Sequence, residues 1–325
     1  MIGSMSLRRG LVLAVVLASV AAACSSGSSG ADGRTGGSGA KQAQAFPASV
    51  DLYTGAPQRV AVGLVFANGT LVSFGTVRFA FSYLGSSGSA QATPGPTVTA
   101  SYVPTPGTPA GGSTPQVTQP SEARGLYEAE DVTFDRAGNW QVQVTADIQG
   151  RGTQSATASL QVADHPALPA PGQPALKTEN HTIRSKGVPA AAIDSRAADG
   201  GTVPDPELHR WTIAEAVAQH RPALVVFATP VYCVSRFCGP VTDAVAQLAK
   251  RFSNRAVFIH VEIWRNFQKQ QINRAAADWL YRNDNLTEPW LYLIGADGTI
   301  LDRWSSLFSV LEVARDLQQL PPMKR

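Results

Sequence analysis

The chain has 325 residues, a net charge of +3 and only 16% charged residues. Its basic residues are scattered rather than clustered, which argues against a nucleic-acid-binding protein. Its three cysteines include no Cys-x-x-Cys pair, so the sequence gives no zinc site built from two such pairs. The length is sufficient for two domains.

The chain begins with a segment that predicts export. Two arginines precede an apolar run that is too short to span a membrane comfortably, as in a secretory signal. The end of this run, "AAAC", resembles the lipobox of bacterial lipoproteins, although Ala21 stands where that family usually has leucine. The resemblance implies a signal peptide over 1–23 and a lipid on Cys24, which anchors the chain to the extracytoplasmic face of the bacterial cell membrane. An ordinary signal peptide with a stray cysteine is the alternative. A Gly/Ser-rich tether over 24–45 holds the rest of the chain off the membrane.

Residues 46–164 are predicted to form an all-β domain. Short β-rich runs are separated by turn signals, among them Asn68-Gly69, which favours a hairpin. The segment "YEAEDVTFDRAGNWQVQV" resembles small immunoglobulin-like modules of bacterial envelopes. The resemblance implies an Ig-like β-sandwich with Trp140 in its core.

The proline-rich stretch over 165–205 predicts an extended linker. The elements predicted after it are a helix over 212–220, a strand buried on both faces over 223–229, a helix over 241–252, a strand over 255–264, a helix over 273–283, a hairpin over 290–304 and a last helix over 306–320. Thr212 and Glu215 predict a capping box for the first helix. Strands that alternate with helices require crossovers and a partly parallel sheet.

Two motifs in residues 206–325 resemble those of thioredoxin-like proteins. "FCGPV" resembles the family's aromatic-Cys-Gly-Pro-Cys segment, with Val241 at the place of the second cysteine. "TEPWLYLIGADGTILDRW" resembles the segment that holds the family's cis-proline, which assigns that role to Pro289. The predicted fold class is therefore an α/β thioredoxin-like C-terminal domain preceded by an all-β immunoglobulin-like sandwich.

The two late cysteines are predicted to form a reversible disulfide. Cys238 is expected where a helix begins, and unpaired backbone N–H groups there favour the reactive thiolate. Gly239 is expected to permit close backbone approach, and Pro240 suits a first helical turn. The alignment makes Cys238 the nucleophile and Cys233 the resolving cysteine. An alternative alignment puts Cys233 at the attacking position and buries Cys238 in the helix start.

The segment departs from the family in its acidic residues. Thioredoxin-like proteins have a buried acidic residue in the strand before the site, and this chain has Val226 at the matching place. Glu288 precedes the predicted cis-proline, where the family usually has an uncharged residue. A carboxylate there is expected to raise the pKa of a neighbouring thiol or to select a cationic partner. Glu288, Pro289, Gly239 and Pro240 are therefore the predicted substrate-contacting residues.

The predicted activity is thiol–disulfide exchange with cysteine-containing envelope proteins, without a cofactor or a bound metal. Two alternatives stay open. The cysteine loop also resembles that of Sco-type copper chaperones, which implies His260 as a distant third ligand. In the other alternative, the chain is a non-catalytic adaptor and the disulfide is a staple worth about 2 kcal/mol.

Overall fold

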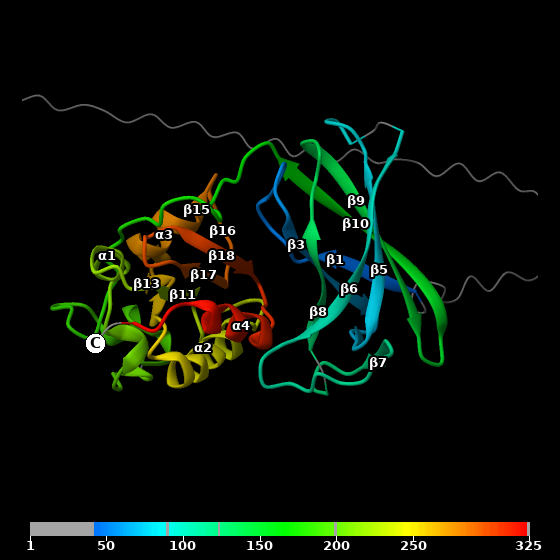
Figure 1. Cartoon of the computed structure of the whole chain (residues 1–325). Helices are drawn as coiled ribbons and strands as arrows, with labels where there is room; N and C mark the ends of the chain where they lie inside the picture. Colours follow the sequence, from blue (N-terminus) through cyan, green and yellow to red (C-terminus); the bar gives the residue numbers. More distant parts are fainter. Residues whose placement is uncertain (1–41, 89–90, 123, 198–199, 324–325) are drawn as a thin grey trace, which may run out of the picture. The chain divides into compact units, whose positions relative to one another are not determined.

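A computed structural model describes residues 42–88, 91–122, 124–197 and 200–323 (Figure 1). The predicted signal peptide, the predicted lipidation site Cys24 and most of the predicted tether lie outside the described residues. Among the described helices, none has the length and apolar character needed to cross a membrane.

The first half of the described chain forms one ten-stranded sheet (Figure 1). Its strands follow the order β2-β10-β9-β5-β6-β8-β3-β4-β7, and β1 pairs with β3. The predicted Asn68-Gly69 turn joins β3 to β4, with Gly69 at φ 82°. The strands are β1 (Ala43–Pro47), β2 (Leu52–Tyr53), β3 (Gln58–Phe66), β4 (Leu71–Ser73), β5 (Thr76–Tyr83), β6 (Thr93–Pro104), β7 (Gln116–Thr118), β8 (Gly125–Val132), β9 (Gly138–Ile148) and β10 (Gly152–Ala163).

The predicted sandwich of two separate sheets is wrong for this region. Strand β6 pairs with β5 over most of its length and with β8 at its end, where Ser101 to Pro104 lie opposite Glu128 to Gly125. A strand that hydrogen-bonds to both neighbours joins what would otherwise be two sheets. The sequence pattern predicted strands on both sides of residues 85–121, but this Pro/Gly/Ser/Thr-rich stretch, which contains β6 and β7, was predicted to be a loop. A local pattern also carries no information on which strands pair.

Trp140 lies in the core of this sheet, as predicted. It is 2% exposed, its ring centroid lies 5.0 Å from that of Phe134, and its indole N–H donates to the Arg136 carbonyl oxygen at 3.0 Å. Strand β9 alternates buried and more exposed residues along its length, which is the pattern of a strand with one face on a core.

The segment predicted as an extended linker contains two short 3₁₀ helices, η2 (Ala190–Ala192) and η3 (Ser195–Ala197). A third, η4 (Pro206–His209), begins just after the predicted end of the linker. Asp194 and Ser195 are almost completely buried. Polar side chains rather than a periodic apolar pattern order this segment, which is why its sequence reads as a linker.

The C-terminal part is built on a four-stranded sheet in the order β12-β11-β17-β18. Strands β11 and β12 are parallel, and the β17–β18 hairpin is antiparallel, as the predicted element order requires. The strands are β11 (Ala223–Ala228), β12 (Val257–Glu262), β17 (Trp290–Ile294) and β18 (Ile300–Ser305), and two small hairpins pair β13 (Trp264–Asn266) with β14 (Gln271–Ile272) and β15 (Tyr281–Arg282) with β16 (Asn285–Leu286).

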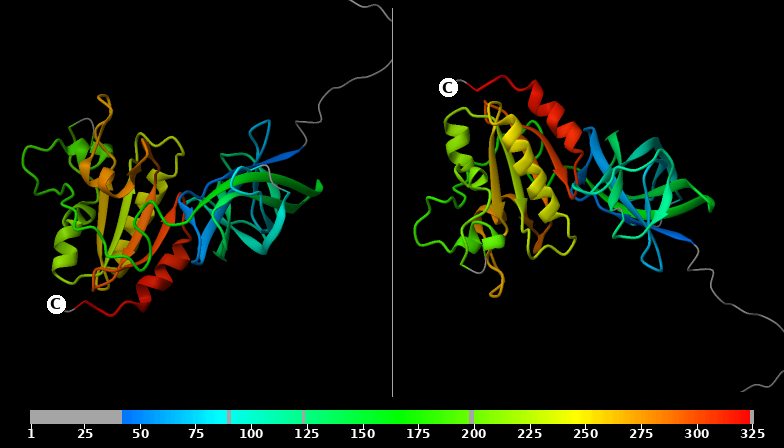
Figure 2. Two further views of the ribbon diagram at one scale, coloured as in Figure 1. Left: turned by 90° about the horizontal axis from the view of Figure 1, so that it is seen from above. Right: turned by 90° about the horizontal axis from the view of Figure 1, so that it is seen from below.

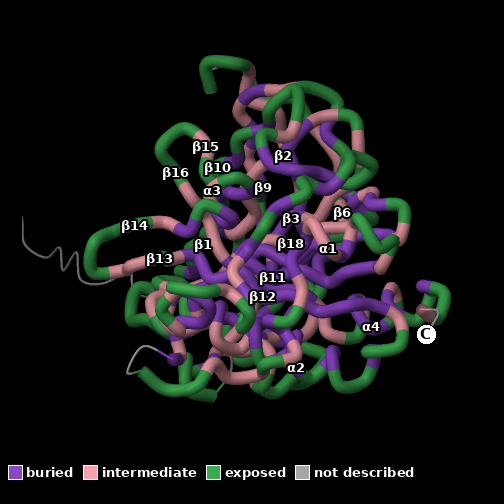
Figure 3. The backbone as a smooth tube through the Cα atoms, turned by 90° about the vertical axis from the view of Figure 1, so that its left-hand side faces the viewer, coloured by how far each residue is buried: buried purple, intermediate pink, exposed green. Residues whose placement is uncertain are grey.

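Helices cover both faces of this sheet. On β11, Leu224 and Val226 pack with α2 (Cys238–Phe252) and α4 (Val310–Gln319), whereas Val225 and Phe227 pack with α1 (Ile213–Ala218) and α3 (Arg274–Leu280). The right-hand view of Figure 2 shows α2 (yellow) and α4 (red) lying over the same face. Strands β11 and β12 are buried throughout (Figure 3). This burial explains the unbroken apolar sequence of β11, whereas β12 also buries two polar residues, His260 and Glu262.

The predicted fold class as a whole is wrong. In the described part of the chain β-structure predominates, with 39% of residues in strands and 17% in helices. Helices α1 and α3, predicted to extend over nine and eleven residues, have six and seven. The prediction assigned helix wherever the apolar spacing allowed it, whereas residues 281–286 form a small hairpin beyond α3.

Candidate functional site

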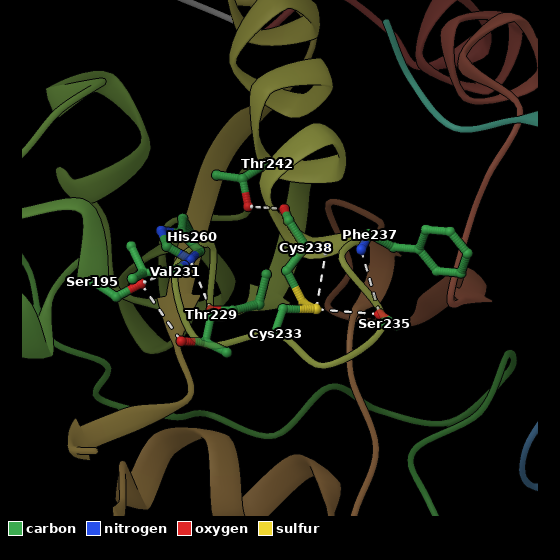
Figure 4. Close-up of a disulfide and its surroundings, with 10 residues drawn as sticks. Ser195, Thr229, Val231, Cys233, Ser235, Phe237, Cys238, Thr242 and His260 are labelled. Atoms are coloured by element: carbon green, nitrogen blue, oxygen red, sulfur yellow. Dashed lines mark hydrogen bonds between the residues drawn. A yellow bond between two sulfur atoms is a disulfide. The ribbon is translucent and has the colours of Figure 1, made fainter. Parts of the chain in front are cut away.

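A disulfide joins Cys233 to Cys238 at the point where β11 leads into α2 (Figure 4). The Cα atoms of the two cysteines are 6.0 Å apart, a normal separation for a disulfide. Cys238 is the first residue of α2 and is 0% exposed. Cys233 lies in the preceding loop and is partly exposed. The bond therefore joins a buried residue, Cys238, to a partly exposed one, Cys233, whose Sγ is called the outer sulfur.

The start of α2 surrounds the outer sulfur with donors. The Cys238 amide donates to Cys233 Sγ at 3.4 Å, and the Ser235 hydroxyl lies 3.2 Å from the same sulfur. No side chain caps α2 at its N-cap residue, Phe237. Free amides and the positive end of the helix dipole favour a negative charge here, so they stabilise a Cys233 thiolate after reduction.

The exposure of the two cysteines favours the alternative alignment, in which Cys233 is the attacking residue and Cys238 is buried. Cys233 is partly exposed, and the loop around it carries Val231 at 53% exposure and Val234 at 96% exposure. Cys238 is sealed between α2 and the sheet, where it belongs to the apolar core. The sequence alignment made Cys238 the attacking residue because of its place at the helix start, but that place also buries it.

The residues predicted to contact substrate lie in two groups. The Glu288–Pro289 peptide bond is cis, as the resemblance implied. Gly239 and Pro240 lie in the first turn of α2, where the missing Pro240 N–H leaves no helical bond unmade. A Cβ atom at Gly239 would lie 3.7 Å from the nearest atom, the Pro230 carbonyl oxygen. That is an ordinary contact, so packing within the chain does not itself require glycine at this position.

Glu288 brings a carboxylate to the disulfide. One of its oxygens and both sulfurs all lie within 4.8 Å of one another. Its Oε2 is buried and has no hydrogen-bond partner among the described residues. Burial, and to a smaller extent the nearby Glu262 carboxylate, raise the pKa of Glu288 to about 8. The sequence predicted that a carboxylate would approach the thiols from this loop, and the structure brings it there.

A second polar cluster lies behind the cysteine loop. Asp194 Oδ2 is 3.3 Å from His209 Nε2 and 3.4 Å from His260 Nδ1, and all three side chains are 0% exposed. His260 Nε2 faces the Ala228 carbonyl oxygen at 3.1 Å. His260 thus groups with Asp194 and His209 rather than with the cysteines, and this grouping weakens its predicted role as a copper ligand.

The carboxylate of Asp194 is ionised by its surroundings. Burial alone would raise the pKa of Asp194, but contacts with His209, His260 and Arg196 outweigh burial and hold that pKa well below its ordinary value. Arg196 donates two side-chain hydrogen bonds and its backbone N–H to the carboxylate. Burial lowers the pKa of His209, whereas contact with Asp194 overcomes burial at His260 and raises its pKa.

Ser195 connects this cluster to the cysteine loop. Its hydroxyl accepts a hydrogen bond from the Val231 amide at 3.2 Å and lies 3.5 Å from the Thr229 hydroxyl (Figure 4). Its own amide donates to Glu262 Oε2 at 2.7 Å. The buried segment around residue 195 therefore fixes the start of the loop two residues before Cys233. Sequence reasoning missed this support because no motif marks the segment.

Aromatic side chains flank the loop on its other side. Tyr232 stacks on Phe267 with ring centroids 4.0 Å apart, and Trp264 meets Phe267 edge-on at 5.3 Å. Trp264 is partly exposed, whereas Trp279, Trp290 and Trp304 are core residues.

The comparisons with known proteins give no family. No protein-family model matches the chain, and no curated protein matches it. The geometry of the site is therefore the basis for any statement about function.

Proposed function

We propose that the protein is a thiol–disulfide oxidoreductase whose outer sulfur, Cys233 Sγ, exchanges with partner proteins. The observation that carries the proposal is the asymmetry of the bond. Cys233 is partly exposed and its sulfur lies against the amide at the start of a fifteen-residue helix, while Cys238 is completely buried. Such a pair lets a partner attack one sulfur while the second stays in place as the leaving or resolving group.

The exchange begins when a partner thiolate attacks Cys233 Sγ. The Cys233–Cys238 bond breaks, a disulfide forms between the partner and Cys233, and Cys238 leaves as a thiolate. A second partner thiolate then attacks the partner's sulfur in this mixed disulfide, and Cys233 is released as a thiolate. The partner is oxidised to a disulfide by two electrons, and the cysteine pair is reduced by two. The reverse sequence reduces a partner disulfide, with Cys238 as the resolving thiolate.

Two further observations support this chemistry over a structural staple. The segment from Phe237 to Val241 resembles the active-site segment of thioredoxin-like proteins, and the segment around Pro289 resembles the one that holds the family's cis-proline. The two cysteines are only five residues apart in sequence, so a structural disulfide between them would stabilise the fold by only about 2 kcal/mol through loop entropy. A purely structural disulfide also does not require that one cysteine be partly exposed and lie beside hydrogen-bond donors at the start of a helix.

The exported, lipid-anchored location belongs to the same proposal. Disulfide exchange is productive outside the cytoplasm, where disulfides persist. The partners are then cysteine-containing envelope proteins, reached from the membrane through a lipid on Cys24. Mass spectrometry of the chain expressed in a bacterium tests this part, because a lipidated Cys24 must be the first residue of the mature protein.

Trapping experiments test the activity. Cys238→Ser leaves the outer sulfur without its resolving partner, so we expect this variant to accumulate mixed disulfides with glutathione and with envelope proteins. Cys233→Ser leaves only the buried sulfur, so we expect little or no trapping, and it serves as the matched control. Equal trapping by the two variants, or none by either, contradicts the proposal.

A further inference from the structure

The cysteine pair and Glu288 together have the composition of a metal site. Two sulfurs and a carboxylate oxygen come from separate parts of the chain, the loop before α2, the first residue of α2 and the loop before β17, and all three atoms lie within 4.8 Å of one another. The oxygen donor is not committed elsewhere, because Glu288 Oε2 is buried without a hydrogen-bond partner among the described residues. A buried carboxylate oxygen of this kind needs a proton or a cation.

From this geometry we propose that the reduced protein binds one Zn²⁺ through Cys233 Sγ, Cys238 Sγ and a Glu288 carboxylate oxygen, with the fourth coordination position open. The proposal rests on the proposed function only in requiring that the disulfide can be reduced. In the disulfide the sulfurs have no thiolate to offer, so the site exists in one redox state alone.

The distances allow such a site after a small movement. Zinc–sulfur bonds of about 2.3 Å and zinc–oxygen bonds of about 2.0 Å place tetrahedral ligand atoms roughly 3.5 to 3.8 Å apart. Reduction must therefore move the sulfurs apart, and the carboxylate oxygen, which lies within 4.8 Å of both, must move closer by no more than about 1 Å. The Cys233 loop has the freedom to do so, since Val234 is 96% exposed and the two residues after it are also exposed.

The donor set distinguishes zinc from copper. Two thiolates alone satisfy Cu(I), which prefers soft ligands, whereas a carboxylate is a hard donor that suits Zn²⁺ in a mixed site. Zinc binding should therefore depend on Glu288, and Cu(I) binding should not. An open fourth position leaves room for water or for a donor from a partner protein.

The other groups of potential ligands carry no comparable site. In the cluster of Asp194, His209 and His260, the guanidinium of Arg196 already occupies the carboxylate and opposes a cation. The acidic side chains of Asp302 and Glu312 likewise bind Arg59. Of the three groups found among the described residues, only the one at the cysteine pair has a carboxylate beside two potential ligands without a cation of its own.

Zinc titration of the full chain tests the proposal, with Cys24→Ser as a common background so that no third thiol contributes. Each protein is reduced, freed of reductant under argon and titrated with Zn²⁺ against a chromophoric chelator. We expect one Zn²⁺ per reduced chain and none per oxidised chain. Glu288→Gln should weaken binding by at least about tenfold. Glu179→Gln, which changes an exposed glutamate outside the site, should leave binding unchanged.

A second measurement does not depend on a variant. Co²⁺ in place of Zn²⁺ should give the intense absorption of a tetrahedral centre with thiolate ligands in the reduced chain alone. Absence of Zn²⁺ binding by the reduced chain, or equal affinity of the wild type and Glu288→Gln, overturns the proposal. If glutathione exchanges with Cys233 while no zinc binds, only this proposal fails. If zinc binds while neither cysteine variant traps a mixed disulfide, the proposed function fails and the metal site stands.

Discussion

Replacing Asp194 by asparagine should destabilise the protein by about 3 kcal/mol. The carboxylate is 0% exposed and accepts three hydrogen bonds from Arg196 as well as contacts from two imidazole rings. Breaking one partner out of a buried ion pair costs about 3–5 kcal/mol. The cost falls at the lower end because Arg196 keeps Asp205 at 3.0 Å and Asp243 at 3.1 Å.

The assay is urea-induced unfolding of the oxidised protein followed by fluorescence. Asp243→Asn is the matched control, because it removes a carboxylate from the same Arg196 at a site where the side chain is 63% exposed. Exposed pairs are worth about 0–1 kcal/mol, so this variant should be close to the wild type. If the two variants lose equal stability, the buried cluster does not support the cysteine loop in the way described.

Three other predictions concern pH, capping and packing. The pKa of Asp194 is lower in the folded chain than in the unfolded one, so its contribution to stability is present above the unfolded pKa of about 3.9 and is lost as pH falls below that value. The stability difference between the wild type and Asp194→Asn should therefore shrink from pH 5 to pH 3 in paired urea titrations. A constant difference would argue against an ionised Asp194. Thr212→Ala should cost about 1 kcal/mol, because it removes the hydroxyl that accepts from the Glu215 amide at the start of α1; unchanged unfolding would show that the cap is unimportant. Trp140→Ala should cost about 3–5 kcal/mol in thermal or chemical unfolding, and a loss below 1 kcal/mol would contradict a core position.

Local structure could be predicted where a single short segment contains all of its determinants. The capping box of Thr212 and Glu215 is present as predicted, because both hydrogen bonds join residues three apart. The strand at 223–228 and the turn at Gly69 were likewise predictable from an apolar run and from an Asn-Gly pair. Each of these features depends on neighbours in sequence.

Pairing and burial could not be predicted in the same way. Nothing local indicates that β6 joins β5 to β8, so the two-sheet sandwich and the overall fold class were predicted wrongly. Which cysteine attacks and which resolves depends on which of the two the sheet and α2 bury, and this burial is a long-range property. Asp194 and Ser195 lie in a segment without periodicity, so their support of the loop has no sequence signal.

The candidate site could be predicted from the sequence only in part. Both cysteines, Glu288 and Pro289 were predicted as members of one site, from a motif and from the resemblance of a distant loop. The free oxygen of Glu288, on which the zinc proposal depends, follows only from the packing of the loop against its neighbours.

The measurement that tests the central claim most directly is the equilibrium of the Cys233–Cys238 bond with glutathione, in metal-free buffer and with Cys24→Ser. An exchanging pair should have a standard potential of about −120 to −270 mV, within the range of known oxidoreductases. The account predicts a value in this range, with the mixed glutathione disulfide on Cys233. A potential below about −300 mV, with no detectable mixed disulfide, would identify the bond as a structural staple and contradict the account.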